Sequence, residues 1–125
     1  MITRGPAGRG YAPATKPQIS RILSASNIPE YPDAYATHGV KVHICKLRLG
    51  HQPRLAGIKH LNRLENVLAA AEWDDPNIAE GIMLDQNEHV IEGTRSNLFL
   101  VRDGKLYTAD LSRCGVAGLQ RDRVI

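Results

Sequence analysis

Three segments of the chain carry residue types that could act together in catalysis. Lys59 follows Gly57, Glu92 precedes Gly93, and a glycine-containing stretch at 115–118 leads into a predicted helix. A lysine amine becomes a nucleophile or a Schiff-base former where a partly apolar site favours its neutral form. A carboxylate can keep an aromatic ring nitrogen protonated, and the free N–H groups at the start of a helix can bind phosphate. The order of these groups favours a site for a phosphorylated ring compound.

Each group also has an ordinary structural explanation. A lysine in the first turn of a helix and an acid at the end of a strand are both typical of solvated surface. Thr94, Ser96 and Asn97 supply hydroxyl and amide groups beside Glu92, but the same residues often form turns. Glycines before a helix are common in loops. The chemical interpretation therefore depends on the three segments taken together.

Other sites receive less support. The loop 5–10 contains Pro6 and lacks both the GxGxxG spacing and a Walker lysine, so it does not indicate a nucleotide loop. His38, His43 and His51 show no ligand spacing, and no metal site is expected. His60 adjoins Lys59 but should point to another helix face, which favours a structural role. No Ser-His-Asp or Gly-x-Ser-x-Gly arrangement occurs.

The elements that must position these residues mix strands and helices. Residues 4–13 predict a loop. Strands are expected at 19–25, 40–46, 79–84 and 89–92. A hairpin of 98–102 and 105–108 should turn at Asp103-Gly104. Leucines at helical spacing predict an amphipathic helix from Lys59 to about Trp73, and another helix should begin near Gly118. The pattern is that of an α+β domain with a core of Leu, Ile, Val and Ala.

Composition sets the broad class of the protein. The chain has 125 residues, 42% of them hydrophobic, and a formal net charge of +3 without a block of like charges. No apolar run of about 18 residues predicts a membrane span, and no basic cluster or stacking aromatics indicate nucleic-acid binding. Cys45 and Cys114 lie outside any CxxC spacing, which favours free or buried thiols in a reducing compartment. We therefore expect a cytoplasmic protein with a small-molecule substrate, and neither a membrane nor a nucleic acid as partner.

The runs Gly57–Ala69, Val90–Phe99 and Gly115–Arg121 together resemble fold-type IV pyridoxal-phosphate enzymes. The resemblance extends through nearly the whole chain and implies a D-amino-acid aminotransferase-like α+β fold. It further implies an internal piece of a longer protein. Residues 1–28 would end the small N-terminal domain, 29–36 would be an interdomain linker, and 37–125 would form an incomplete C-terminal cofactor domain. Members of this group are usually homodimers, so a homodimer is expected of the full-length protein.

The resemblance also implies roles for particular residues. Lys59 would carry the pyridoxal 5′-phosphate and act as the catalytic base, while Glu92 would pair with the pyridine nitrogen. Further cofactor contacts would come from the backbone amides of Leu119 and Gln120 at the phosphate, Val116 against the ring, and Ser96 and Asn97 along the wall. Arg9 and Tyr11 would lie on a loop that faces the substrate.

Within the group, the loop Arg4–Tyr11 and the run Leu47–Glu65 are most similar to aminodeoxychorismate lyases. This similarity implies conversion of 4-amino-4-deoxychorismate to 4-aminobenzoate and pyruvate, a reaction of folate biosynthesis. Arginine forks suit such a dicarboxylate substrate, and Arg9 is the expected partner. Two alternatives stay open: an amino-acid transaminase of the D-amino-acid or branched-chain type, and an inactive or purely structural fragment of such an enzyme.

Overall fold

The computed structural model describes all 125 residues, which form two compact units, Met1–Pro32 and Asp33–Ile125. The first unit contains two short antiparallel strands, β1 (Ile2–Thr3) and β2 (Ser20–Arg21). The strand predicted at 19–25 is therefore much shorter than expected. Gly5, at a φ of 78°, follows soon after β1 and ends its extended backbone, so only Ile2 and Thr3 pair with β2.

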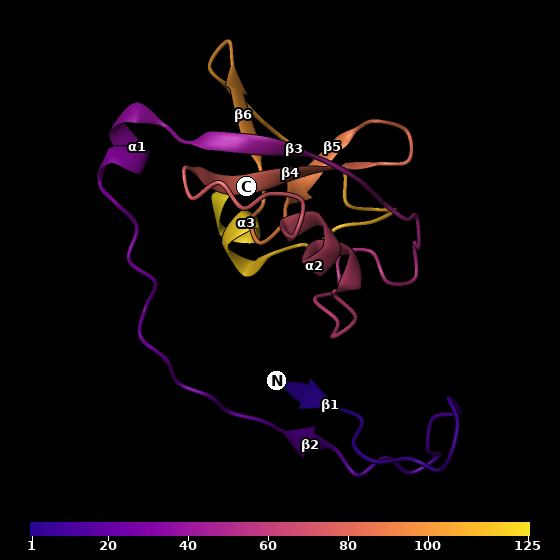
Figure 1. Ribbon diagram of the computed structural model, residues 1–125. Helices are drawn as coiled ribbons and strands as arrows, with labels where there is room; N and C mark the ends of the chain where they lie inside the picture. Colours follow the sequence, from indigo (N-terminus) through magenta and orange to yellow (C-terminus); the bar gives the residue numbers. More distant parts are fainter. The chain divides into compact units, whose positions relative to one another are not determined.

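A three-stranded sheet organises the second unit (Figure 1). Helix α1 (Ala34–His38) precedes it, and the strands are β3 (Lys41–Leu49), β4 (Ile78–Asp85) and β5 (Val90–Gly93), in the order β3-β4-β5. β3 and β4 are parallel, whereas β4 and β5 are antiparallel. A parallel pair needs a long crossover connection, and the segment that contains Lys59 provides it. The predicted strands at 40–46, 79–84 and 89–92 are confirmed, β3 being three residues longer at its end.

The crossover helix is shorter than predicted. α2 spans Leu64–Ala70, so Lys59 does not lie in its first turn. Gly57 has a φ of 77° and pairs with the loop around Val116, which holds residues 57–63 in an irregular path. The leucine periodicity also misidentified the buried face: Leu64 is 61% exposed, whereas Ala69 is fully buried. The helix packs on β3 and β4 through its small and polar residues.

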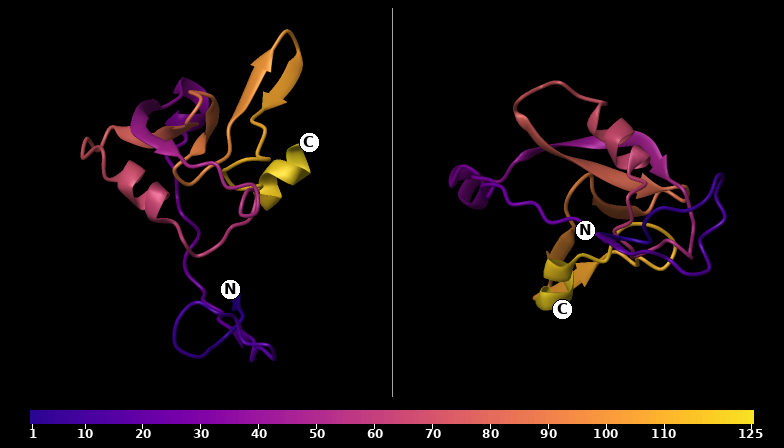
Figure 2. Two further views of the ribbon diagram at one scale, coloured as in Figure 1. Left: turned by 90° about the vertical axis from the view of Figure 1, so that its right-hand side faces the viewer. Right: turned by 90° about the horizontal axis from the view of Figure 1, so that it is seen from below.

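The hairpin prediction is confirmed. β6 (Phe99–Arg102) and β7 (Lys105–Thr108) pair antiparallel around Asp103 and Gly104, which both have positive φ, as a two-residue turn of this kind requires. Helix α3 (Leu119–Val124) begins directly after Gly118, also as predicted. Figure 2 shows α2 on one side of the unit, with the hairpin and α3 on the other.

The core differs from the expected aliphatic one. Its buried members are Cys45, Leu49, Ala69, Met83, Ile91 and Cys114, so two thiols and a thioether share the core with the expected Leu, Ala and Ile. Both cysteines are free, as expected. The α+β class is confirmed. None of the helices has the length and apolar composition needed to cross a membrane.

Candidate functional site

A buried carboxylate lies at the end of β5. Glu92 is 3% exposed, and its Oε2 accepts a hydrogen bond of 2.8 Å from the backbone N–H of Val116. Burial raises the pKa of this carboxyl, and the nearby charges of Arg63 and Lys59 oppose that rise. A carboxylate so placed can meet a cationic group of a ligand at low desolvation cost, because its own desolvation has already been incurred in folding.

Asn97 ties Glu92 and Val116 into a closed ring of contacts. Its backbone forms an isolated β-bridge with Glu92, and its side-chain Nδ2 donates to the Val116 carbonyl at 2.8 Å. A Cβ on Gly118 would lie only 2.4 Å from Asn97 Oδ1, so a glycine is needed for the chain to pass this close. The spacing of Glu92, Asn97 and the 115–118 segment in the sequence thus corresponds to direct contact in the structure.

The loop that carries Lys59 joins the same group. Gly57 forms a parallel bridge with Val116: its N–H donates to the Gly115 carbonyl at 2.9 Å, and its carbonyl accepts from Ala117 at 3.0 Å. Lys59 follows two residues later and is exposed. Its charge acts on the carboxyl of Glu92. The structure therefore brings the lysine loop, the acid and the glycine segment together around Val116.

Sequence reasoning missed three residues next to this site. Arg63 donates to His60 Nε2 at 2.7 Å, and its own Nε is buried without a hydrogen-bond partner. Asn66, in the first turn of α2, donates to the carbonyl of Thr94 at 3.0 Å. His60 lies in no helix, so the expected helix face does not exist. The three-residue spacing of 60, 63 and 66 was the only sequence signal, and polar residues at this spacing are equally typical of the solvated face of a helix.

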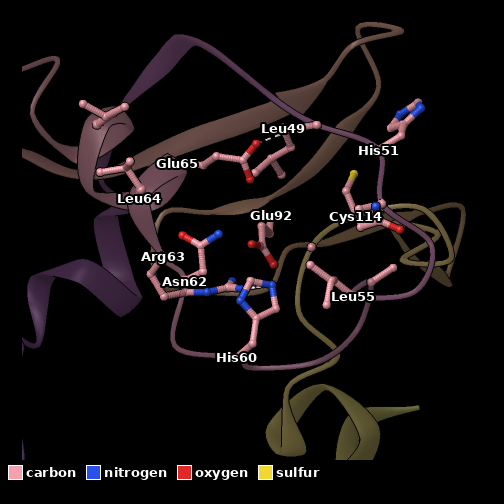
Figure 3. Close-up of a pocket in the computed structure, with 15 residues that line it drawn as sticks. Leu49, His51, Leu55, His60, Asn62, Arg63, Leu64, Glu65, Glu92 and Cys114 are labelled. Atoms are coloured by element: carbon pink, nitrogen blue, oxygen red, sulfur yellow. Dashed lines mark hydrogen bonds between the residues drawn. The ribbon is translucent and has the colours of Figure 1, made fainter. Parts of the chain in front are cut away.

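A cavity of about 370 Å³ opens beside the acid. In Figure 3 Glu92 lies at its centre, with Arg63 and His60 on one side and His51 and Cys114 on the other. Leu49 and Leu55 add apolar wall. Lys59 is not among the lining residues. The volume falls in the range of small-molecule sites, which are mostly apolar with a few polar groups.

At the edge of this cavity, His51, Asp85 and Cys114 each place one atom that could bind a metal within 4.8 Å of the others, a cluster that the histidine spacing did not predict. Asp85 Oδ2 lies 2.9 Å from His51 Nε2, and Oδ1 accepts the N–H groups of Asn87 and His89. Burial raises the pKa of Asp85, but these hydrogen bonds outweigh it and hold the pKa well below its usual range. Protein donors thus already occupy the carboxylate.

The remaining predicted site residues lie in different places. Leu119 and Gln120 form the exposed first turn of α3, where N–H groups have no partner within the helix. Ser96 Oγ donates to Glu80 Oε2 at 2.8 Å. Arg9 and Tyr11 belong to the first unit, and both are exposed. A place for these two at the site stays a prediction.

Comparison with known proteins identifies the family. The family model described as amino-transferase class IV matches residues 1–125. The chain belongs to the class IV aminotransferase family. This class IV chain is 44% identical over 124 residues to an aminodeoxychorismate lyase of Vibrio harveyi, a match that covers 99% of the chain and 46% of the relative. It is also 38% identical over 64 residues to a branched-chain-amino-acid aminotransferase of Escherichia coli K12, covering 51% of the chain and 21% of that relative.

A solved structure is similar over nearly the same length. The crystal structure of 4-amino-4-deoxychorismate lyase from Pseudomonas aeruginosa matches with a TM-score of 0.94 and 54% identity, covering 98% of this class IV chain and 46% of that one. The resemblance drawn from the sequence motifs is therefore confirmed, as is the fold-type IV architecture. The chain spans about half the length of the lyases it matches.

Proposed function

We propose that this chain forms the cofactor-binding part of a pyridoxal 5′-phosphate-dependent 4-amino-4-deoxychorismate lyase. The observation that carries the proposal is the Glu92 carboxylate, buried at a cavity and hydrogen-bonded to the segment that precedes α3. A buried acid with a raised pKa suits a protonated pyridine nitrogen, whose positive charge would restore the ionised form. The lyase relatives at 44% and 54% identity favour this reaction over other activities of the family.

The residues present fit such a cofactor. Glu92 would face the pyridine nitrogen, and Val116 would pack against the ring. The N–H groups of Leu119 and Gln120 would bind the phosphate, because they begin α3 without intrahelical partners. Asn97 would hold this wall through its bond to the Val116 carbonyl, and Ser96 would support the wall from the preceding turn. The homodimer and the cytoplasmic location expected from the sequence belong to the same proposal.

In the proposed mechanism, Lys59 holds the cofactor and also moves a proton. When bound, the cofactor supplies an electron-withdrawing ring that stabilises negative charge on the substrate carbon beside the amine. The amine of Lys59 would take the proton from that carbon. Glu92 would keep the ring nitrogen protonated. Arg9 would pair with a substrate carboxylate, and Tyr11 would lie beside it. Loss of that proton together with breakage of the ring carbon–oxygen bond would make the ring of 4-aminobenzoate aromatic and release enolpyruvate, which takes up a proton to become pyruvate.

The first test is spectroscopic. Addition of pyridoxal 5′-phosphate to the protein should produce an absorption band characteristic of a protein-bound Schiff base. Lys59→Ala should abolish the band, whereas Lys105→Ala, which removes an exposed lysine of the β6–β7 hairpin, should leave it unchanged. A band that survives in Lys59→Ala would show that the lysine assignment is wrong.

The second test separates a lyase from a transaminase, the alternative favoured by the branched-chain aminotransferase relative. A lyase should release 4-aminobenzoate and pyruvate from 4-amino-4-deoxychorismate without any amino acceptor. Turnover that requires pyruvate or 2-oxoglutarate as acceptor would support the transaminase instead. Cofactor binding without either activity would leave the binding part of the proposal standing and refute the lyase part.

A further inference from the structure

Glu80 of β4 is another largely buried acid, and the proposed mechanism does not use it. Its side chain is 14% exposed. Oε1 accepts hydrogen bonds from Thr94 Oγ1 at 2.6 Å and from Thr94 N at 3.1 Å, and Oε2 accepts from Ser96 Oγ at 2.8 Å. Burial raises the pKa of Glu80, but the bonds from Thr94 and Ser96 outweigh it and keep the pKa below its usual value. Oε1 also accepts the backbone N–H of Gly81 at 2.9 Å. The side-chain donors that hold the carboxylate, however, all come from one short segment, residues 94–96.

That segment is the tight turn 93–96, which follows Glu92. Gly93 N–H donates to the Ser96 carbonyl at 2.7 Å, and Thr94 N lies 3.0 Å from the Gly81 carbonyl. A Cβ on Gly93 would lie 2.2 Å from Ser96 Oγ and 2.9 Å from the carboxyl carbon of Glu80. The turn thus closes directly over the carboxylate, and the hydroxyl groups of Thr94 and Ser96 both donate to it.

The 93–96 turn joins two residues that build the candidate site. The residue before it is Glu92, and the residue after it is Asn97, which bridges back to Glu92. Asn97 holds the Val116 carbonyl, and Val116 N–H holds Glu92 Oε2. A change in the path of the turn therefore shifts Asn97, and through it the segment that leads into α3.

We propose that Glu80 is a positioning residue of the cofactor site: by fixing the 93–96 turn it sets the distance between Glu92 and Asn97, and so the alignment of Val116. This inference rests on the proposed function for its effect on the cofactor. Its structural part, the coupling from Glu80 to residues 115–118, is independent of any ligand. Glu80 touches neither the cofactor nor the substrate in this scheme.

The chain offers a matched control in Glu72. Its side chain is 17% exposed, and it accepts hydrogen bonds from the backbone N–H groups of Lys46 and Leu47 at 2.6 and 2.8 Å. These donors belong to β3 and do not contact the ring of Glu92, Asn97 and Val116. Loss of either acid leaves donors unpaired, so the two alanine variants should lower the urea midpoint of unfolding by similar amounts.

The decisive measurement is hydrogen exchange in the cofactor-free protein. Glu80→Ala should speed amide exchange at 93–97 and also at 115–118, whereas Glu72→Ala should speed it only near β3. Titration with pyridoxal 5′-phosphate should then give a dissociation constant about tenfold higher for Glu80→Ala, the size expected for the loss of one coupled hydrogen bond. Glu72→Ala should stay within about twofold of the wild type by the same reasoning.

Glu80→Gln gives a graded check if the alanine variant does not fold. Its amide oxygen can still accept from Thr94, but its NH₂ group cannot accept the Ser96 hydroxyl proton, so exchange and affinity should fall between those of the wild type and Glu80→Ala. Unchanged exchange at 115–118, or equal effects of the Glu80 and Glu72 variants, would overturn the positioning role. Altered exchange in a protein that does not bind the cofactor at all would refute the proposed function while leaving the structural coupling intact.

Discussion

Replacement of Glu92 by glutamine should remove a destabilising effect of rising pH. Burial raises the pKa of this carboxyl from its ordinary 4.5, so the folded cofactor-free protein retains a proton that the unfolded chain has released. Wherever the folded state binds more protons than the unfolded state, stability falls as pH rises. Glu92 should therefore destabilise the protein progressively from about pH 4.5, its unfolded pKa, up to its raised folded pKa.

The size of the effect follows from the number of protons. A single group exchanges at most one, which limits the slope to about 1.4 kcal/mol per pH unit within that window. Glutamine removes the titration but keeps an oxygen that can accept the Val116 N–H, a bond of 2.8 Å in the structure. The variant should thus lack the slope, and above the window it should be more stable than the wild type.

Urea unfolding of the cofactor-free protein between about pH 5 and 8 gives the free energy of unfolding of the wild type and of Glu92→Gln. The difference between the two values at each pH isolates the contribution of Glu92. Glu88→Gln is the control, because Glu88 is an exposed acid whose pKa is lowered by its hydrogen bond with Arg48. Glu88 therefore stabilises the protein above pH 4.5 and loses this contribution as the pH falls, which is the opposite sign to Glu92. If Glu92→Gln keeps the wild-type slope, or is less stable at the upper end of this range, burial does not dominate at Glu92 and the reasoning fails.

Two further outcomes test the packing around the site. Gly115→Ala and Gly104→Ala both place alanine at a positive φ, but only at Gly115 would the Cβ lie 2.8 Å from side-chain atoms of Ile91 and Leu111. Urea unfolding should therefore show that Gly115→Ala loses about 1–3 kcal/mol more stability than Gly104→Ala. Equal losses of stability would mean that the neighbouring side chains move aside. Burial raises the pKa of the Cys114 thiol to about 11, so alkylation near neutral pH should be slow until the protein unfolds, and rapid labelling of the native protein would contradict this.

Local signals predicted local structure well. Asp103-Gly104 identified the hairpin because a two-residue turn needs two positive φ angles, which few residue pairs accept. The start of α3 directly after Gly118 was also predicted correctly from the local sequence. The same approach failed at Lys59, where evenly spaced leucines suggested a helix. There Gly57 pairs with Val116, which is distant in the sequence, and this tertiary contact overrides the periodicity.

The sequence singled out the segments that meet in the structure, but not all of the contacts between them. Lys59, Glu92 and the 115–118 segment were recognisable as chemical types in order, and the structure brings their loops together around Val116. Asn66 and Glu80 were not recognised, because their contacts depend on which faces of α2 and β4 meet the 93–96 turn, and Arg63 was missed because its partner His60 lies in an irregular loop. Polar residues in such positions look like ordinary surface until the packing is known.

The close approach of Gly118 to Asn97 carries a consequence for how this family can diverge. A Cβ at position 118 would lie 2.4 Å from Asn97 Oδ1, so the two positions share one volume. Relatives with a side chain at 118 should carry a shorter residue at 97, and those that keep asparagine at 97 should keep glycine at 118. The pair should therefore covary across the family, as a substitution at either position becomes acceptable only after the other has changed.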